Sequence, residues 1–270
     1  VSRAACAGDI GQASFLRLSL FNALKGLSGA DVVVLCGGTH FHDHRKKGVA
    51  GAAWIVKLLR WWLFFGAARL LGAKVVYLGI GVGPFSGRLA RYLTRHILRL
   101  ADRFTVRDAR SLRICRRLGV GKTCAQASDL AFLRSSVDAP RCSGGDGKPV
   151  GVSLLPYYEW YRGEPGKDHA VTDELATHLT AAARQDDVQE VVLFACFAHV
   201  DSPMARELAQ KIDGADVRVV EFSGDVDAFM AEMRACDCFV GFRLHSSICA
   251  ALLGLPLFMI LYHRKCEAFA

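Results

Sequence analysis

The sequence predicts an α/β protein with two Rossmann-like domains, each built around a parallel sheet. Short apolar runs rich in Val, Ile and Leu alternate with stretches of helical periodicity along almost the whole chain, which is typical of strands buried between layers of helices. The segment Ser135–Lys148, rich in Ser, Gly, Asp and Pro, separates two such series. We therefore expect an N-terminal domain at residues 1–140, with its first strand missing, and a C-terminal domain at residues 149–270, facing each other across a cleft.

The first series begins with a buried parallel strand, because Asp31–Leu35 reads DVVVL and is followed by glycines. The segment Gly79–Pro84 is also rich in glycine, and we expect it to turn sharply after a strand, at the sheet edge where ligands bind. The other elements expected here are helices at Trp54–Leu71, Arg88–Leu100 and Asp108–Leu118 and strands at Lys74–Leu78 and Arg103–Val106.

The second series repeats the alternation and so predicts a second parallel sheet. Its expected strands are Pro149–Leu154, Glu190–Ala195, Val217–Glu221, Cys238–Gly241 and Leu257–Leu261. Its expected helices are Thr172–Arg184, Met204–Ile212, Val226–Ala235 and Ser246–Leu253. Open parallel sheets bind ligands beyond the carboxyl ends of their strands, so the turns that follow strands are the first places to search for a site.

Composition and charge indicate a globular protein with an anionic partner. Of the 270 residues, 52% are hydrophobic and 22% charged, and the formal net charge is +8. Phosphate donors, acidic polysaccharide and lipid pyrophosphate all suit that charge. We expect no nucleic-acid partner, because the basic residues are spread over many helices without an interleaved aromatic patch.

Cysteine usage and hydropathy favour a cytoplasmic protein. Many of the ten cysteines lie in apolar runs, and no C-x-x-C pair occurs, which is typical of reduced, buried cysteine. Trp54–Leu71 is the most membrane-like segment, but Lys57, Arg60 and Arg69 make it a poor spanning helix. A core helix is the favoured interpretation. The alternative is a basic, Trp-rich helix that rests on a membrane surface, which would place the protein at the inner face of the membrane.

Two motifs suggest cofactors that we do not expect. His40, His42 and His44 alternate, so on a strand they would share one face and could bind a metal. Because they follow Gly-Gly-Thr, we favour a loop or helix start with histidines that face solvent or substrate, and no metal. Gly79–Gly83 falls short of a dinucleotide-binding motif, since Pro84 stands where the last glycine belongs.

The sharpest functional signal is the pair Arg243 and His245, which lies between a predicted strand and a predicted helix. Ser246 or Ser247 can cap that helix, whose free N–H groups and dipole favour an anion. Arg243 offers a planar fork for phosphate or carboxylate, and His245 can donate a proton near neutral pH. The alternative is that Arg243 pairs with a neighbouring carboxylate and that His245 is a packed structural histidine.

Taken in order, the motifs resemble those of the polysaccharide pyruvyl transferases along nearly the whole chain. The matching segments are Ala30–Gly38 with Asp43, Gly79–Pro84, Thr105–Asp108 with Ser111, Ser128–Phe132, Arg243–His245, Gly254–Pro256 and Tyr262–Lys265. One position differs, because Leu155 stands where the family often has an arginine that helps to hold the donor.

The resemblance implies a fold like that of the B-type glycosyltransferases, with the donor in the cleft between the domains. It implies transfer of a pyruvyl group from phosphoenolpyruvate to sugar hydroxyls of a polysaccharide or its lipid-linked precursor, forming a ketal without a metal or other cofactor. Arg243 and His245 would be the catalytic pair. The substrate-binding residues would be Arg107, Ser246, Ser247, Gly37, Gly38, Asp43, Gly81, Gly83, Asp129 and Lys265.

Other assignments stay open at this point. A B-type glycosyltransferase with a nucleotide-sugar donor would need a base pocket and an acidic residue for the ribose, neither of which the sequence locates. A non-catalytic relative that holds an anionic glycan is motivated by Leu155. Asp43 and Asp129 could orient the acceptor hydroxyls, although Asp129 could equally serve a turn or a helix cap.

Overall fold

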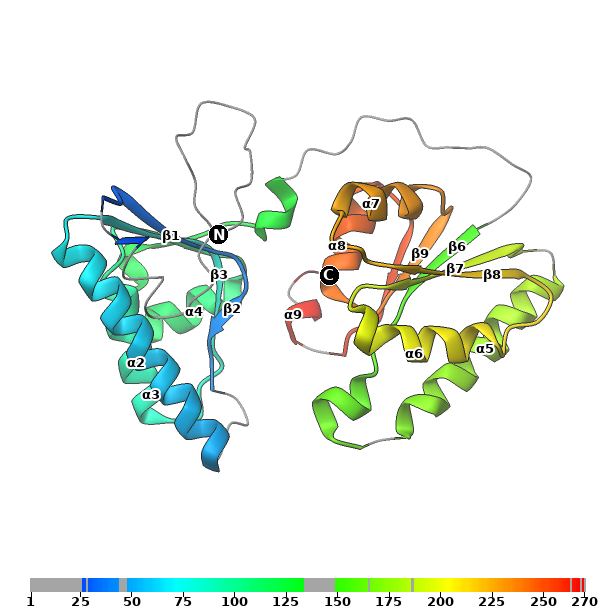
Figure 1. Cartoon of the computed structure of the whole chain (residues 1–270), viewed down its shortest axis with the longest axis horizontal. Helices are drawn as coiled ribbons and strands as arrows, with labels where there is room; N and C mark the ends of the chain where they lie inside the picture. The colour runs from blue at the N-terminus through cyan, green and yellow to red at the C-terminus, as the bar shows by residue number, and fades with distance from the viewer. Residues whose placement is uncertain are drawn as a thin grey trace. The chain divides into compact units, whose positions relative to one another are not determined.

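The structure, a computed structural model, describes residues 26–27, 29–43, 48–133, 149–164, 166–185, 187–262, 264–267 and 269. The chain divides into two compact units, Val1–Leu130 and Ala131–Ala270. Each unit contains a parallel sheet with helices packed on it (Figure 1). The predicted α/β class with two parallel-sheet domains is therefore confirmed. The segment predicted as a linker, Ser135–Lys148, lies outside the described residues.

The sheet of unit 1 has the strand order β1-β3-β4-β5, with the short β2 also paired to β3. All its pairings are parallel. Its strands are β1 (Val32–Cys36), β2 (Thr39–Phe41), β3 (Lys74–Val82), β4 (Arg103–Val106) and β5 (Cys124–Gln126).

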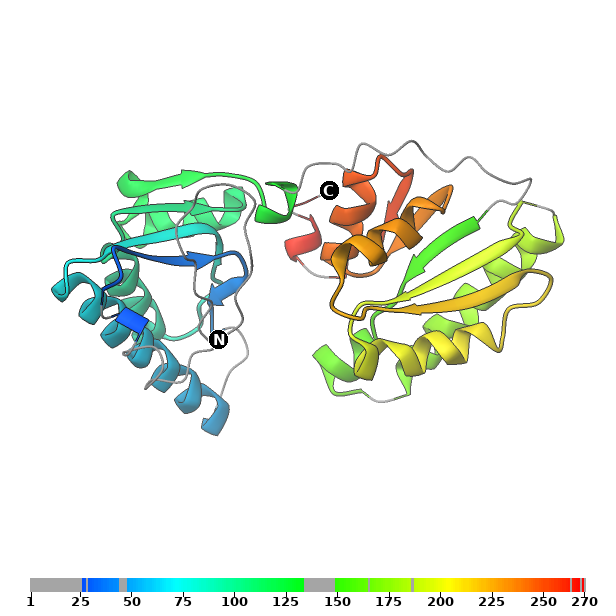
Figure 2. The same cartoon turned by 45° about the horizontal axis from the view of Figure 1, so that its top comes forward.

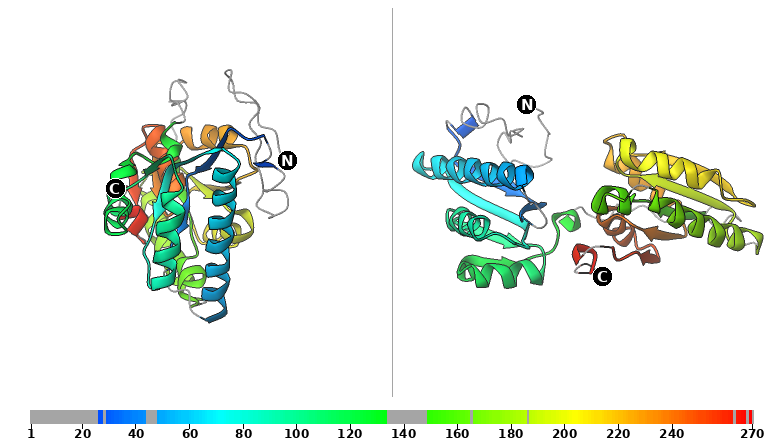
Figure 3. Two further views of the ribbon diagram at one scale, coloured as in Figure 1. Left: turned by 90° about the vertical axis from the view of Figure 1, so that its left-hand side faces the viewer. Right: turned by 90° about the horizontal axis from the view of Figure 1, so that it is seen from below.

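Three helices cover one face of this sheet: α2 (Gly48–Leu70), α3 (Arg88–Arg99) and α4 (Ala109–Arg117). The chain steps from each strand to the next in one direction across the sheet, and right-handed crossovers then place every helix on the same side. Accordingly, α2 and α3 lie side by side (Figures 1 and 3). Two short 3-10 turns flank β5: Gly121–Thr123 precedes it, and Leu130–Leu133 follows it at the boundary between the two units.

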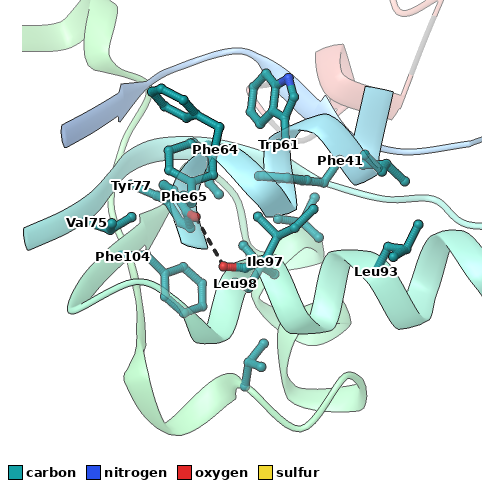
Figure 4. Close-up of a cluster of buried hydrophobic side chains, with 14 of the residues drawn as sticks. Phe41, Trp61, Phe64, Phe65, Val75, Tyr77, Leu93, Ile97, Leu98 and Phe104 are labelled. Atoms are coloured by element: carbon teal, nitrogen blue, oxygen red, sulfur yellow. Dashed lines mark hydrogen bonds between the residues drawn. The ribbon is translucent and has the colours of Figure 1, made fainter. Parts of the chain in front are cut away.

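Aromatic side chains fill the space between these helices and the sheet (Figure 4). Phe65 packs edge-on against Tyr77 with ring centroids 5.0 Å apart, and Phe41 packs in the same way against Trp61 at 5.5 Å. Tyr77 is fully buried, and its hydroxyl donates to the backbone carbonyl of Ile97 at 3.1 Å. The core thus satisfies its buried hydroxyl, as burial of a polar group requires.

Two local predictions for unit 1 are wrong. The glycine-rich segment does not turn after Leu78, because β3 continues to Val82. The chain after the first strand is not a loop or helix start either, since Thr39–Phe41 forms β2 and pairs with Gly81 and Val82. Close approach explains both: a Cβ on Gly81 would lie 2.8 Å from the Thr39 side-chain oxygen, so glycine lets the two strands meet.

Unit 2 has a five-stranded parallel sheet in the order β10-β9-β6-β7-β8. Its strands are β6 (Pro149–Ser153), β7 (Glu190–Ala195), β8 (Asp216–Glu221), β9 (Cys238–Gly241) and β10 (Leu257–Met259). Its helices are α5 (Lys167–Arg184), α6 (Ala198–Ala209), α7 (Val226–Arg234), α8 (Leu244–Leu252) and α9 (Arg264–Glu267), with a π-helical turn at Tyr158–Arg162.

The path of the chain through unit 2 reverses at β6. It runs outward through β7 and β8, then returns to place β9 and β10 on the other side of β6. Figures 1 and 2 show the result: α5 and α6 cover one face of the sheet, and α7 and α8 cover the other. Separate apolar clusters fill the two faces. The carboxyl ends of β6 and β9 therefore meet at a topological switch point, where sheets of this kind bind ligands.

Candidate functional site

Hydrogen bonds join the carboxyl ends of β6 and β9 at the switch point. The backbone N–H of Phe242 donates to the Ser153 hydroxyl at 3.2 Å, and the hydroxyls of Ser153 and Ser246 form a hydrogen bond at 2.7 Å. Ser153 and Ser246 are both buried. The start of α8 is thereby fixed to the central strand, which holds the residues between β9 and α8 in one position.

Arg243 lies at this junction and is held by two partners. Its guanidinium forms an ion pair with the fully buried carboxylate of Asp201, and it stacks on the ring of Phe197 with its Cζ 4.7 Å from the centroid. The side chain is 15% exposed, so it still reaches the surface. Its Nε is buried and makes no hydrogen bond within the described part of the chain. The guanidinium is thus oriented by the protein, and its exposed part can contact a ligand.

The N-terminus of α8 differs from the prediction. The helix begins at Leu244, with Arg243 at the N-cap position and no side chain capping it. Ser246 and Ser247 do not serve as caps, because both hydroxyls donate to the backbone carbonyl of Arg243, at 2.8 and 2.9 Å. His245 therefore falls in the first turn of the helix, and its side chain is exposed. An uncapped first turn with an arginine at its N-cap favours an anion.

Asp201 was not among the residues predicted from the sequence. This residue lies in the first turns of α6, which begins at Ala198 rather than at the predicted Met204, and its second oxygen accepts the N–H of Phe197 at 2.9 Å. The sequence signal that could have indicated it is an acidic residue shortly after the carboxyl end of β7, where ligand-binding residues are expected. Burial, assisted by the negative charge of Asp201, raises the pKa of the Cys196 thiol to about 12.

In unit 1, Arg107 and Asp129 lie together at the carboxyl edge of the sheet. Arg107 donates to the Asp129 carboxylate at 2.8 Å and to the Thr39 hydroxyl at 2.8 Å. The two charged side chains are only 9% and 14% exposed. These contacts tie the end of β4 to β2 and to the segment after β5. Arg107 thus stabilises the carboxyl edge of the sheet through its contacts with Asp129 and Thr39.

Asp43 is buried, and its carboxylate accepts the backbone N–H groups of Ser86 and Gly87, the latter at 2.6 Å. These amides lie immediately before α3, so Asp43 stabilises the start of that helix from a distant segment. Asp43 and the loop before α3 form part of the same edge as Gly83, whose N–H donates to the Phe41 carbonyl at 2.6 Å.

The predicted glycines of unit 1 have backbone reasons for their identity. Gly37, Gly38 and Gly83 have φ angles of 56°, 69° and 77°, which favour residues without a Cβ. Gly81 has no such angle and is required by its close approach to β2. They shape the edge of the sheet on which Arg107 lies.

His40 and His42 pack against α2. The His40 ring lies 5.1 Å from that of Trp61, and the His42 ring stacks on that of Trp54 at 4.7 Å. Burial, followed by the positive charge of Lys57, lowers the pKa of His40. His44 lies outside the described residues, among which no group of three His, Cys, Asp or Glu side chains is arranged to hold a metal ion.

The predicted residues therefore form two groups. One comprises Arg243, His245, Ser246 and Ser247 at the switch point of unit 2. The other comprises Gly37, Gly38, Asp43, Gly81, Gly83, Arg107 and Asp129 at the carboxyl edge of unit 1. Lys265 lies in α9, where Cys266 packs with Leu244 and Ile248 of α8; the side chain of Lys265 is outside the described part of the structure.

A family model described as polysaccharide pyruvyl transferase matches residues 5–264. The chain belongs to the polysaccharide pyruvyl transferase family. The match confirms the resemblance found in the sequence motifs.

Other comparisons add little to the family assignment. A crystal structure of accessory secretory protein 1, 2 and 3 in Streptococcus pneumoniae superposes with a TM-score of 0.45 at 14% identity, over 90% of this chain. The chain spans 44% of that structure's chain. No curated protein matches the sequence. Within the described residues, no helix has both the length and the apolar character needed to cross a membrane.

The position at which this pyruvyl transferase family member departs from the family pattern is part of its core. Leu155 follows β6 and is 2% exposed, in the apolar cluster that also contains Leu154 and Phe242. It contributes packing and no hydrogen-bond donor.

Proposed function

We propose that this protein transfers a pyruvyl group from phosphoenolpyruvate to two hydroxyls of a sugar, in a polysaccharide or its lipid-linked precursor, and so forms a cyclic ketal. The observation that carries the proposal is the combination of an oriented, partly exposed Arg243 at an uncapped helix start with an exposed His245 two residues later. Phosphoenolpyruvate carries a phosphate and a carboxylate. Both anionic groups can bind to the guanidinium of Arg243 and to the free backbone N–H groups of the first turn of α8.

In the proposed reaction, Arg243 and the N–H groups of the first turn of α8 bind the donor's anionic groups. His245 acts as the general acid and protonates the methylene carbon of the enol, so that positive charge develops at the neighbouring carbon. One sugar hydroxyl attacks that carbon, the bond to phosphate breaks, and a second hydroxyl closes the ketal. Of the two hydroxyl protons lost, one replaces the proton given by His245 and the other leaves with phosphate. Fixed positive charge stabilises the departing phosphate.

The buried ion pair with Asp201 fits this role. A guanidinium that is already oriented loses less freedom when it binds a ligand than one on a mobile side chain. Asp201 also reduces the net charge of the corner, which keeps an otherwise buried cation from being costly in the absence of the donor. We expect no metal or redox cofactor to take part.

The test is release of inorganic phosphate from phosphoenolpyruvate in the presence of sugar or lipid-linked acceptors. Arg243→Lys should lower kcat/KM by about 10²–10³-fold, because a point charge replaces a planar fork. His245→Ala should lower kcat by about 10²–10⁴-fold with little change in the KM for the donor. Arg184→Lys and His178→Ala, on the exposed surface of α5, are matched controls that should retain full activity.

A second candidate, a relative that binds an anionic glycan without catalysis, is favoured by the burial of Leu155. Glycan binding by a protein that releases no phosphate with any acceptor would establish it. Turnover of a nucleotide sugar in place of phosphoenolpyruvate would instead establish a glycosyltransferase. Activity in either site variant equal to that of its control would refute the roles of Arg243 and His245.

A further inference from the structure

We propose that the outward-facing surface of α2 and α3 binds an anionic lipid bilayer. This surface, called here the outer face, is made of Val56, Leu59, Leu63 and Leu70 on α2 and Arg91 and Arg95 on α3. The inference does not depend on the reaction proposed above, because it rests on a surface and not on the residues of the switch point.

The first observation is that α2 is apolar on two opposite sides. Its inner side packs Leu58, Trp61 and Phe65 into the core. On its outer side the four apolar residues of the outer face recur at intervals of three, four and seven residues, which places them on one stripe of the helix. They are exposed by 54%, 39%, 60% and 90%, in the order Val56, Leu59, Leu63 and Leu70. An ordinary surface helix would carry polar residues there.

The second observation is that α3 continues the outer face with positive charge. Both helices bury one side on the same face of the sheet, so their opposite sides point away from it together (Figures 3 and 4). Arg91 and Arg95 are exposed, and the guanidinium of Arg95 lies near Gly119, in the segment that follows α4. The ion pairs of unit 1 within the described ranges, Arg69 with Asp102 and Arg107 with Asp129, involve neither residue. Arg60, on α2, is exposed in the same way.

The third observation is the distribution of acidic residues along the chain. Between Asp43 and Asp102 the sequence holds eleven Lys and Arg residues and no Asp or Glu. Unit 1 has 21 basic and 6 acidic residues, a formal charge of +15, whereas unit 2 has 13 and 20, a charge of −7. The net charge of +8 is therefore the sum of a strongly basic unit 1 and an acidic unit 2. Such charge asymmetry indicates that unit 1 binds an anionic surface.

Together these observations select a bilayer over the other possible occupants. Leucine side chains offer nothing to the phosphates or bases of a nucleic acid, but they enter the boundary between headgroups and acyl chains. A second copy of the chain would bring two sets of like charges together, which is unfavourable. Apolar residues that insert, with exposed arginines on the neighbouring helix to bind anionic headgroups, form the pattern of a surface lying in the membrane interface.

The test is cosedimentation of the whole chain with lipid vesicles. Vesicles of phosphatidylcholine with about 30% phosphatidylglycerol should bind the protein, pure phosphatidylcholine much less, and raised salt should weaken the binding. Leu59→Asn with Leu63→Asn, and separately Arg91→Glu with Arg95→Glu, should each weaken binding at least about tenfold. Phe258→Asn and the pair Arg162→Glu with Arg184→Glu, on exposed positions of unit 2, are the matched controls.

A measurement on the unaltered surface complements the variants. In a Trp160→Phe protein, Trp62 is the indole of α2 that is substantially exposed, at 42%, and its emission should shift to shorter wavelength on anionic vesicles. The proposal is overturned if the protein does not sediment with anionic vesicles, or if the outer-face variants bind as their controls do. It is also overturned if light scattering shows a dimer that the leucine variant dissociates, since the outer face would then bind a second copy.

Discussion

The ion pair between Arg243 and Asp201 shows how one carboxylate can serve two neighbours. Asp201 neutralises a mostly buried guanidinium, and a buried charge without such a partner is costly. The same negative charge helps burial to raise the pKa of the nearby Cys196 thiol to about 12, while Arg243 acts in the opposite direction. The thiol is therefore a reporter of the charge balance at the switch point.

Asp201→Asn should lower the pKa of Cys196, because it removes the negative charge that disfavours the thiolate and leaves the positive charge of Arg243 uncompensated. The measurement is the pH dependence of alkylation at Cys196, followed by mass spectrometry of the peptide that contains it. Asp173→Asn, on the exposed surface of α5, is the control and should leave the curve in place. A curve unchanged in Asp201→Asn would mean that burial alone sets the thiol pKa.

His40 should make the stability of the protein depend on pH. Its folded pKa lies below the ordinary value of 6.5, because burial and the charges of Lys57 and Arg107 disfavour the imidazolium. Below about pH 6.5 the unfolded chain binds a proton at this site that the folded chain resists, so the free energy of unfolding falls as the pH is lowered. Above that pH the contribution is constant.

The difference between wild type and His40→Gln isolates this contribution. Urea unfolding between pH 8 and pH 5 should show a shallower fall in the variant, since glutamine does not titrate. His178→Gln, at an exposed position of α5, should follow the wild type. If His40→Gln loses stability on acidification as steeply as the wild type, other histidines dominate the pH dependence.

At the scale of elements, two helices show different ways to begin. At α7, Asp225 caps its own helix and accepts the N–H groups of Asp227 and Ala228 at the surface. At α3, the carboxylate comes from Asp43, far away in the sequence and buried. Both satisfy two backbone donors, but the carboxylate of Asp43 is buried and that of Asp225 is exposed.

Asp43→Ala should therefore cost about 2–4 kcal/mol of stability, because two part-buried hydrogen bonds to a charged group are lost. Asp225→Ala should cost about 1 kcal/mol, as at an exposed N-cap. Urea unfolding gives both values, and hydrogen exchange at Ser86 and Gly87 should accelerate only in the Asp43 variant. Equal costs for the two substitutions would show that the Asp43 contacts add nothing beyond ordinary capping.

The same contrast explains which elements could be predicted from the sequence. Strands such as Cys238–Gly241 carry their own signal in a run of apolar residues, and β9 has the predicted bounds. The strand-to-helix position of Arg243 and His245 followed from that pattern. Asp201 could not be predicted as their neighbour, because its contact with Arg243 spans 42 positions and depends on how β7 and β9 are ordered in the sheet.

Helix ends and glycine-rich segments were harder to predict, because they too depend on residues that are distant in the sequence. Serines near the start of a helix predict a cap, yet Ser246 uses its hydroxyl on Ser153, a residue on another strand. The glycines at Gly79–Gly83 predict a turn, yet β3 runs through Gly81 because β2 lies close beside it. Local sequence states which conformations a segment tolerates, and the neighbouring strand decides which of them is used.

At the scale of the whole molecule, each unit carries its own sheet and its own core. In unit 2 the three apolar clusters that cover the sheet and pack α8 against α9 draw all their buried members from residues 150–266. The opposite charges of the two units, +15 and −7, are a property of the surfaces and leave these cores unaffected. Unit 2 thus meets the physical requirements of an independent domain.

A fragment of residues 131–270 should therefore fold alone. We expect it to unfold in urea in one cooperative transition, with far-UV and near-UV circular dichroism changing together, because its core is closed within the fragment. Val192→Asp, which buries a charge in the central part of the sheet, should abolish that transition and is the control for a collapsed but unpacked chain. A fragment that binds a hydrophobic dye and loses near-UV signal without the substitution would show that unit 1 is needed to complete the packing of unit 2.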